Sequence, residues 1–138
     1  MTINLNFKHI NYNKNVKELE YKVKSWISDL TFYKIEIEFL NKIINTYPFK
    51  SNTRNLFENI QIYTQNLDDF KSKGFLFLKR LTTIKQQITK TSKEDIQKKH
   101  SQFIEEFHKL EYEILIFLET YKNLKNSIYN YFYAQLSN

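Results

Sequence analysis

The chain has 138 residues and a formal charge of +6, and it contains no cysteine, one glycine and one proline. A chain of this length can bury a core without disulfides or a structural metal. One glycine and one proline cannot supply the many turns of a β-sandwich or barrel, so an all-β fold is excluded. The aromatic content of 17% likewise excludes full disorder.

The first fifteen residues differ in character from the rest. Residues 1–15 contain no continuous apolar run of the kind that a secretory signal needs, and no stretch of the chain is apolar enough to predict a membrane span. We therefore expect a cytoplasmic protein. The alternation of Ile3, Leu5 and Phe7 with polar residues predicts either a frayed tail or a short extended segment. Residues 16–138 are expected to form a single domain.

A seven-residue repeat organises the remainder of the chain. The repeat selects 31 positions at alternating steps of three and four, and 29 of them are apolar or aromatic, the exceptions being Gly74 and His100. A spacing of 3.5 residues predicts an all-α fold of three long helices with coiled-coil-like heptad packing. The positions are Val16, Leu19, Val23, Trp26, Leu30, Tyr33, Ile37, Leu40, Ile44 and Tyr47, then Leu56, Ile60, Tyr63, Leu67, Phe70, Gly74, Phe77, Leu81, Ile84 and Ile88, then Ile96, His100, Phe103, Phe107, Leu110, Ile114, Phe117, Tyr121, Leu124, Ile128 and Tyr131.

Interruptions of the repeat predict where the helices end. Pro48 disfavours helix at the residue before it, and the polar run that follows offers N-caps to a second helix. Thr91 with Glu94 has the spacing of a capping box for a third helix. The predicted helices therefore span about 16–47, 53–89 and 93–136. Both connections are short, which predicts an up-down-up antiparallel bundle.

Folding the repeat back on itself predicts which core residues lie level with one another. If the first two helices pair so that residue numbers sum to about 100, Trp26 lies opposite Gly74. The missing side chain at Gly74 then makes room for the indole, the alternative being a hinge at that position. The same register groups Ile37 with Tyr63 and Tyr121 in one layer, as filled core or, less simply, as the wall of a small pocket.

Few residues have the spacing of a catalytic or metal site. Glu105 and His108 have the spacing used in carboxylate-bridged di-iron bundles, and an exposed His108 also suggests a phosphotransfer site. The di-iron hypothesis lacks support, because no second such motif is present and the pair points away from the predicted core. The phosphotransfer hypothesis lacks support, because the neighbours of His108 are Phe107, Lys109, Leu110 and Glu111 rather than the small residues expected of a docking surface. His100 is expected at the core or its edge. There is no glycine-rich phosphate loop and no cysteine nucleophile. We predict no enzymatic activity, no cofactor and no metal.

Lysines gather at one end of the predicted bundle. Such a patch can attract nucleic acid or an anionic membrane. A solvated lysine-rich surface is the simpler interpretation, because the chain has few arginines and no aromatic residues interleaved with these lysines. The candidate residues are Lys22, Lys24, Lys79, Arg80, Lys85, Lys98 and Lys99.

Two of the predicted helices carry apolar residues outside the repeat. Three helices bury one stripe each, so these residues are surplus to a lone bundle, and large exposed apolar patches usually mark contacts. We expect a non-catalytic interaction or scaffold protein, a homodimer or a binder of another protein, with a nucleic-acid-binding accessory role as the alternative. The predicted interface comprises Phe32, Ile35, Phe39, Ile43, Ile116, Tyr129, Phe132 and Tyr133.

Overall fold

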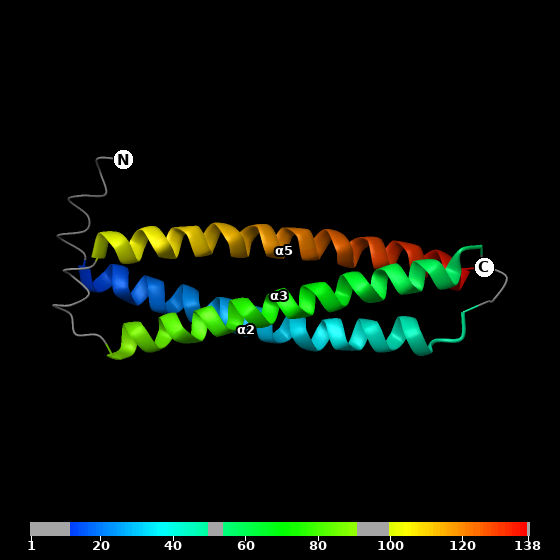
Figure 1. The fold of residues 1–138 in the computed structure, drawn as a ribbon, viewed down its shortest axis with the longest axis horizontal. Coiled ribbons are helices and arrows are strands. Elements are labelled where there is room, and N and C mark those ends of the chain that lie inside the picture. The colour runs from blue at the N-terminus through cyan, green and yellow to red at the C-terminus, as the bar shows by residue number, and fades with distance from the viewer. Residues whose placement is uncertain (1–11, 50–53, 91–99, 138) are drawn as a thin grey trace.

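The computed structural model describes residues 12–49, 54–90 and 100–137. Within these ranges it contains three long helices, α2 (Tyr12–Thr46), α3 (Leu56–Lys90) and α5 (His100–Ser137), and no strand. Figure 1 shows the three helices side by side in an elongated bundle, with α3 running opposite to α2 and α5. The predicted three-helix bundle is confirmed.

The observed helix ends correct several predicted boundaries. Helix α2 begins at Tyr12, so the last residues of the segment expected to be a tail are helical. It ends at Thr46, two residues before Pro48, as the conformational restriction before proline requires. Helix α3 begins at Leu56, later than predicted, directly after Asn55. Asn55 has a φ of 60°, in the left-handed region that asparagine tolerates better than most residues.

Other predictions, about the N-terminal segment and the start of the third helix, concern residues that lie outside the described ranges. These are the alternation in residues 1–7, the capping box at 91–94, and the start of the third helix near residue 93. Lys98 and Lys99 lie there as well. The described part of α5 begins at His100, and the side chain of His100 is not described either.

Most of the buried core residues occupy positions of the repeat; Phe132 is buried outside it, and Tyr47, a repeat position, is 46% exposed. One buried cluster occupies the half of the bundle that holds the start of α2, and a second occupies the other half. Phe70 of α3 packs against both clusters and joins them. The first cluster contains Leu19, Val23, Trp26, Leu30, Leu81, Ile88, Phe107, Leu110, Ile114 and Phe117, and the second contains Ile37, Leu40, Ile44, Leu56, Leu67, Tyr121, Ile128 and Phe132.

Polar contacts between α2 and α3 show a register that differs from the predicted one. In each of three polar side-chain contacts between the two helices, the numbers of the two residues sum to 109 rather than to the predicted value of about 100. The shift arises because α3 begins beyond the end of α2 (Figure 1), so the chain does not fold back directly after Thr46. The pairs are Asn41 Nδ2 to Asp68 Oδ1 at 3.0 Å, Asn45 Nδ2 to Thr64 Oγ1 at 2.9 Å, and Lys71 Nζ to Glu38 Oε1 at 3.2 Å.

Gly74 therefore has a different neighbour from the one predicted. A Cβ built on Gly74 meets the Cζ atom of Phe117 at 3.5 Å and no atom of Trp26 within 4 Å. The Trp26 indole instead packs against the ring of Phe107, with 5.5 Å between centroids. Helix α3 continues without interruption through Gly74, which is evidence against a hinge. The room next to this glycine is occupied by Phe117 from α5.

The predicted tyrosine layer is only partly correct. Ile37 and Tyr121 belong to the same buried cluster. Tyr63, however, contacts the rings of Tyr131 and Phe132, at 5.7 and 5.8 Å between centroids, further toward the end of the bundle. The register shift between α2 and α3 accounts for this displacement.

Helix α5 lies farther from its neighbours than α2 and α3 lie from each other. Large rings fill the space, since Phe107, Phe117 and Tyr121 of α5 are all buried. Phe117 contacts Phe70 and Phe77 of α3, at 5.3 and 5.2 Å between ring centroids. Aromatic side chains thus set the spacing of the third helix and leave the seam between α3 and α5 relatively open.

Candidate functional site

Helix α2 carries a stripe of exposed apolar side chains along its outward face. Phe32, Ile35, Phe39 and Ile43 are 57%, 60%, 62% and 40% exposed. Their spacing of three and four residues places them on one side of the helix, roughly opposite the buried Ile37 and the core positions that follow it. Four large side chains in such a row exceed the scattered exposed residues of an ordinary surface.

Two exposed tyrosines of α5 extend this stripe. Lys125 Nζ lies 3.2 Å from Glu36 Oε1, so this flank of α5 faces α2. Tyr129 and Tyr133 follow Lys125 at steps of four residues and therefore lie on the same flank. Both tyrosines are exposed. We call the set Phe32, Ile35, Phe39, Ile43, Tyr129 and Tyr133 the aromatic face.

The other two residues of the predicted interface lie elsewhere. Phe132 is only 7% exposed and belongs to the core, where its ring contacts Phe49 and Tyr63. The prediction that Phe132 lies on the surface is wrong. A straight helix rotates by about 20° per heptad relative to a strict seven-residue repeat, which turns this position inward by the end of α5. Ile116 is exposed, but it lines the opposite flank of α5, beside α3.

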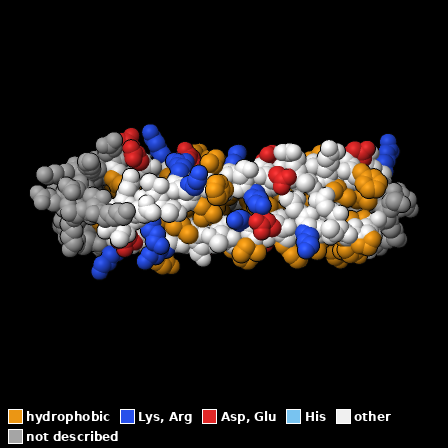
Figure 2. All heavy atoms as spheres, turned by 60° about the horizontal axis from the view of Figure 1, so that its bottom comes forward, with side chains coloured by type: hydrophobic (Ala, Val, Ile, Leu, Met, Phe, Trp, Pro, Cys, Tyr) orange, Lys and Arg blue, Asp and Glu red, His pale blue; other side chains and the backbone are white. Residues whose placement is uncertain are grey.

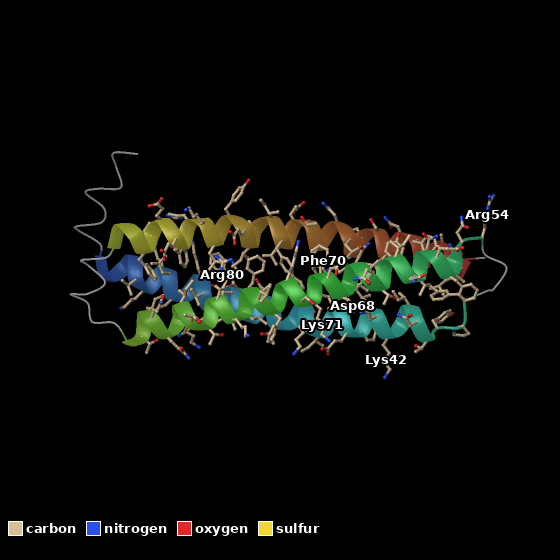
Figure 3. All side chains as sticks on the ribbon, in the orientation of Figure 1. Lys42, Arg54, Asp68, Phe70, Lys71 and Arg80 are labelled. Atoms are coloured by element: carbon tan, nitrogen blue, oxygen red, sulfur yellow. The ribbon has the colours of Figure 1, made fainter. Side chains whose placement is uncertain are left out.

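The seam between α3 and α5 contains an elongated hollow that the repeat does not predict. It consists of two adjoining cavities of about 520 and 450 Å³. Figure 3 shows Phe70 and Arg80 of α3 in the gap between these two helices. We call this hollow the α3–α5 groove. It is lined by Phe70, Lys73, Leu76, Phe77, Lys79, Arg80, Thr83, Ile84, Gln87, Glu106, Lys109, Leu110, Glu113, Ile116, Phe117 and Thr120.

The groove exposes residues that the repeat assigns to the core. Phe70 and Phe77 occupy repeat positions, yet both are only partly buried. Arg80 Nη1 lies 2.6 Å from Glu113 Oε2 across the seam, where the two cavities meet. The one sequence feature that points to this groove is the single glycine, Gly74, among aromatic residues in the middle of α3. Periodicity alone does not reveal the distance between two helices.

The described cations of the lysine-rich end lie on different sides of the bundle. Lys22 pairs with Glu111 of α5 at 3.0 Å. Lys24 and Lys85 line a hollow between α2 and α3. Lys79 and Arg80 border the α3–α5 groove, where the Lys79 ammonium lies over the ring of Phe75. The described cations are therefore distributed over all three seams, an arrangement less suited to tracking a phosphate backbone than a single strip would be.

A polar cluster joins α2 to α5 near the middle of the core. The buried Tyr121 donates its hydroxyl hydrogen to Glu36 Oε1 at 2.6 Å. Lys125 Nζ reaches the same oxygen and lies over the rings of Tyr33 and Tyr121. Burial, followed by the hydrogen bond to the Glu36 carboxylate, raises the pKa of Tyr121 well above its ordinary value. Within this cluster the Glu36 carboxylate and the Lys125 ammonium pair with each other, so neither charge is left without a partner, which is typical of a structural role.

The residues considered for catalysis are exposed and dispersed. Glu105 and His108 both lie on the surface of α5, and His108 Nδ1 lies 3.3 Å from Glu111 Oε1. Burial tends to raise the pKa of Glu111, but hydrogen bonds and charge from Lys22 and His108 outweigh it and lower that pKa. Among the described residues, no group of three or more histidine, aspartate or glutamate side chains is arranged to hold a metal ion.

Charged groups of both signs occur along the whole bundle. Figure 2 shows them on the visible face, with apolar side chains grouped between them in the middle of the rod and toward the end where α3 begins. None of the three helices, over its described residues, has an apolar stretch long enough to cross a membrane. Comparison of the chain with models of known families, with curated proteins and with solved structures finds no match.

Proposed function

We propose that this chain is a non-catalytic helical scaffold protein that associates with a second copy of itself through the aromatic face. The observation that carries the proposal is the α2 stripe, in which Phe32, Ile35, Phe39 and Ile43 form one row of exposed apolar side chains. Water contact with such a row is unfavourable, and a second identical row can cover it.

The size of the stripe fits a reversible dimer. Burying the remaining exposed surface of one such side chain contributes on the order of 1 kcal/mol. Two copies contribute eight side chains from α2, with the tyrosines of α5 at the margin. The gross gain is comparable with the roughly 4–15 kcal/mol of freedom lost on association. We therefore expect a dimer whose population depends on protein concentration.

The test is the solution mass, measured by light scattering on a sizing column over a range of concentrations at low and high salt. We expect a dimer that persists at high salt, because an apolar interface is not weakened by screening. Phe39→Glu should shift the population to monomer. Phe75→Glu is the matched control, because Phe75 is comparably exposed but lies on α3, outside the aromatic face.

Either of two results would refute the proposal. One is a wild-type chain that remains monomeric at all concentrations. The other is a dimer that Phe39→Glu leaves intact. A nucleic-acid complex that persists at moderate salt and depends on the base sequence would instead support the nucleic-acid-binding alternative, whereas one that dissociates at moderate salt and ignores sequence would reflect only non-specific attraction to the lysines.

A further inference from the structure

We propose that the α3–α5 groove binds an amphipathic helix of a partner protein that carries acidic residues beside its apolar face. This inference concerns a different surface from the aromatic face and does not depend on self-association. It rests on the chemistry of the groove floor, on the length of the groove and on the charges along its rims.

The floor of the groove is apolar and fixed in place by ring contacts. Phe70 and Phe77 both pack on Phe117, with centroid separations of 5.3 and 5.2 Å. The two phenylalanines of α3 are only partly buried, although they occupy core positions of the repeat. Ile116 and Leu76, which also line the groove, are 49% and 59% exposed. The bundle thus leaves a preformed apolar site open, as ligand and partner sites usually are.

The dimensions of the groove match a helix. Its lining extends from residue 70 to residue 87 along α3, and from residue 120 back to residue 106 along α5. At 1.5 Å per residue, the α3 side measures roughly 25 Å, the length of a helix of about 17 residues. A helix seated there would complete a four-helix arrangement. It would also satisfy its own backbone hydrogen bonds, whereas an extended peptide would find no sheet edge among the described residues.

Charges on the rims favour an acidic partner. Arg80 and Glu113 neutralise each other within the groove, at 2.6 Å. The remaining charged lining residues are Lys73, Lys79 and Lys109 against the single acid Glu106. Among the described residues, none of these three lysines takes part in an ion pair. Because they stand on both sides of the groove, acidic residues on either flank of a docked helix would meet a cation.

The test uses the full chain and two synthetic 18-residue peptides with the same leucine face, one flanked by glutamates and the other by lysines. Binding of each fluorescently labelled peptide is followed by anisotropy at low salt. We expect the acidic peptide to bind at least ten-fold more tightly than the basic one. Ile116→Glu should weaken its binding by at least ten-fold. The double substitution Lys73→Glu with Lys109→Glu should reverse the preference between the two peptides.

The control variant is Phe39→Glu, which alters the aromatic face and leaves the groove unchanged. It should bind the acidic peptide like the wild type, so a failure of the proposed self-association and a failure of groove binding can be told apart. Helix content, measured by circular dichroism, must remain unchanged in every variant that is compared. The proposal is overturned if both peptides bind equally, if neither binds, or if Ile116→Glu has no effect.

Discussion

Replacing Gly74, the single glycine of the chain, by alanine should make this protein more stable. Gly74 lies in the middle of α3, and its φ is not positive, so an L-residue fits the backbone there without strain. The added methyl group would lie 3.5 Å from Phe117 Cζ, which is ordinary van der Waals contact. The space is therefore sufficient for alanine.

The expected gain in the free energy of unfolding has two sources, the helix propensity of alanine and its contact with Phe117. Glycine in a helix interior is less favourable than alanine by about 0.8–1.0 kcal/mol, because it loses more backbone freedom on folding. The new contact with Phe117 adds a small further gain, since the position is already partly buried. We expect the free energy of unfolding to increase by about 1 kcal/mol, which corresponds to a shift of roughly 0.5 M in the urea midpoint for a domain of this size.

The assay is urea unfolding followed by circular dichroism, with Ser72→Ala as the matched control. Ser72 is exposed on the same helix, so its replacement measures the gain from helix propensity alone, which is at most about 0.5 kcal/mol. Gly74→Ala should exceed that gain. A decrease in stability would show that Phe117 cannot accept the methyl group, and the account of the spacing between α3 and α5 would then be wrong.

Three further predictions follow from the core and its polar contacts. Trp26→Ala should lower the free energy of unfolding by about 3–5 kcal/mol, and a double-mutant cycle should show coupling of Trp26 with Phe107 but none with Gly74. Tyr121→Phe should cost about 1.5–3 kcal/mol at neutral pH, through loss of the hydrogen bond to the Glu36 carboxylate. Because the raised pKa of Tyr121 favours the protonated phenol in the folded state, wild-type stability should fall as the pH rises above the ordinary value of 10.0, and Tyr121→Phe should remove that part of the slope. Lys22→Gln should raise the pKa of Glu111 toward its ordinary value, as measured by NMR titration.

The sequence predicts what depends on local periodicity. The repeat identifies the three helices and most of the buried residues, because each apolar position contributes to the pattern independently of the others. It also places Phe32, Ile35, Phe39 and Ile43 outside the core, where the structure has them exposed. A helical stripe that does not coincide with the repeat is visible without knowledge of the neighbouring helices.

Features that depend on how the helices are placed relative to one another were predicted less well. The length of the connection between α2 and α3 does not fix the register of these two helices, so the register predicted from the sequence pairs Gly74 with Trp26 instead of Phe117. A strict heptad places Phe132 on the surface, because it ignores the slow rotation of a straight helix. The α3–α5 groove results from the spacing that bulky rings impose between two helices, and no sequence period reports that spacing.

The positions of the two candidate surfaces bear on how such a protein would work. All three pairs of helices are in contact, so the bundle is triangular in section, and the outward face of α2 points away from the seam between α3 and α5. A dimer formed through the aromatic face would therefore leave both grooves open, one on each outer side. Two partner helices bound to the two grooves of one dimer would be held close together, so each would have a high effective concentration near the other without any new contact between them. Such a dimer would bring two copies of its partner together, and disrupting it with Phe39→Glu should abolish that bridging while leaving each groove able to bind.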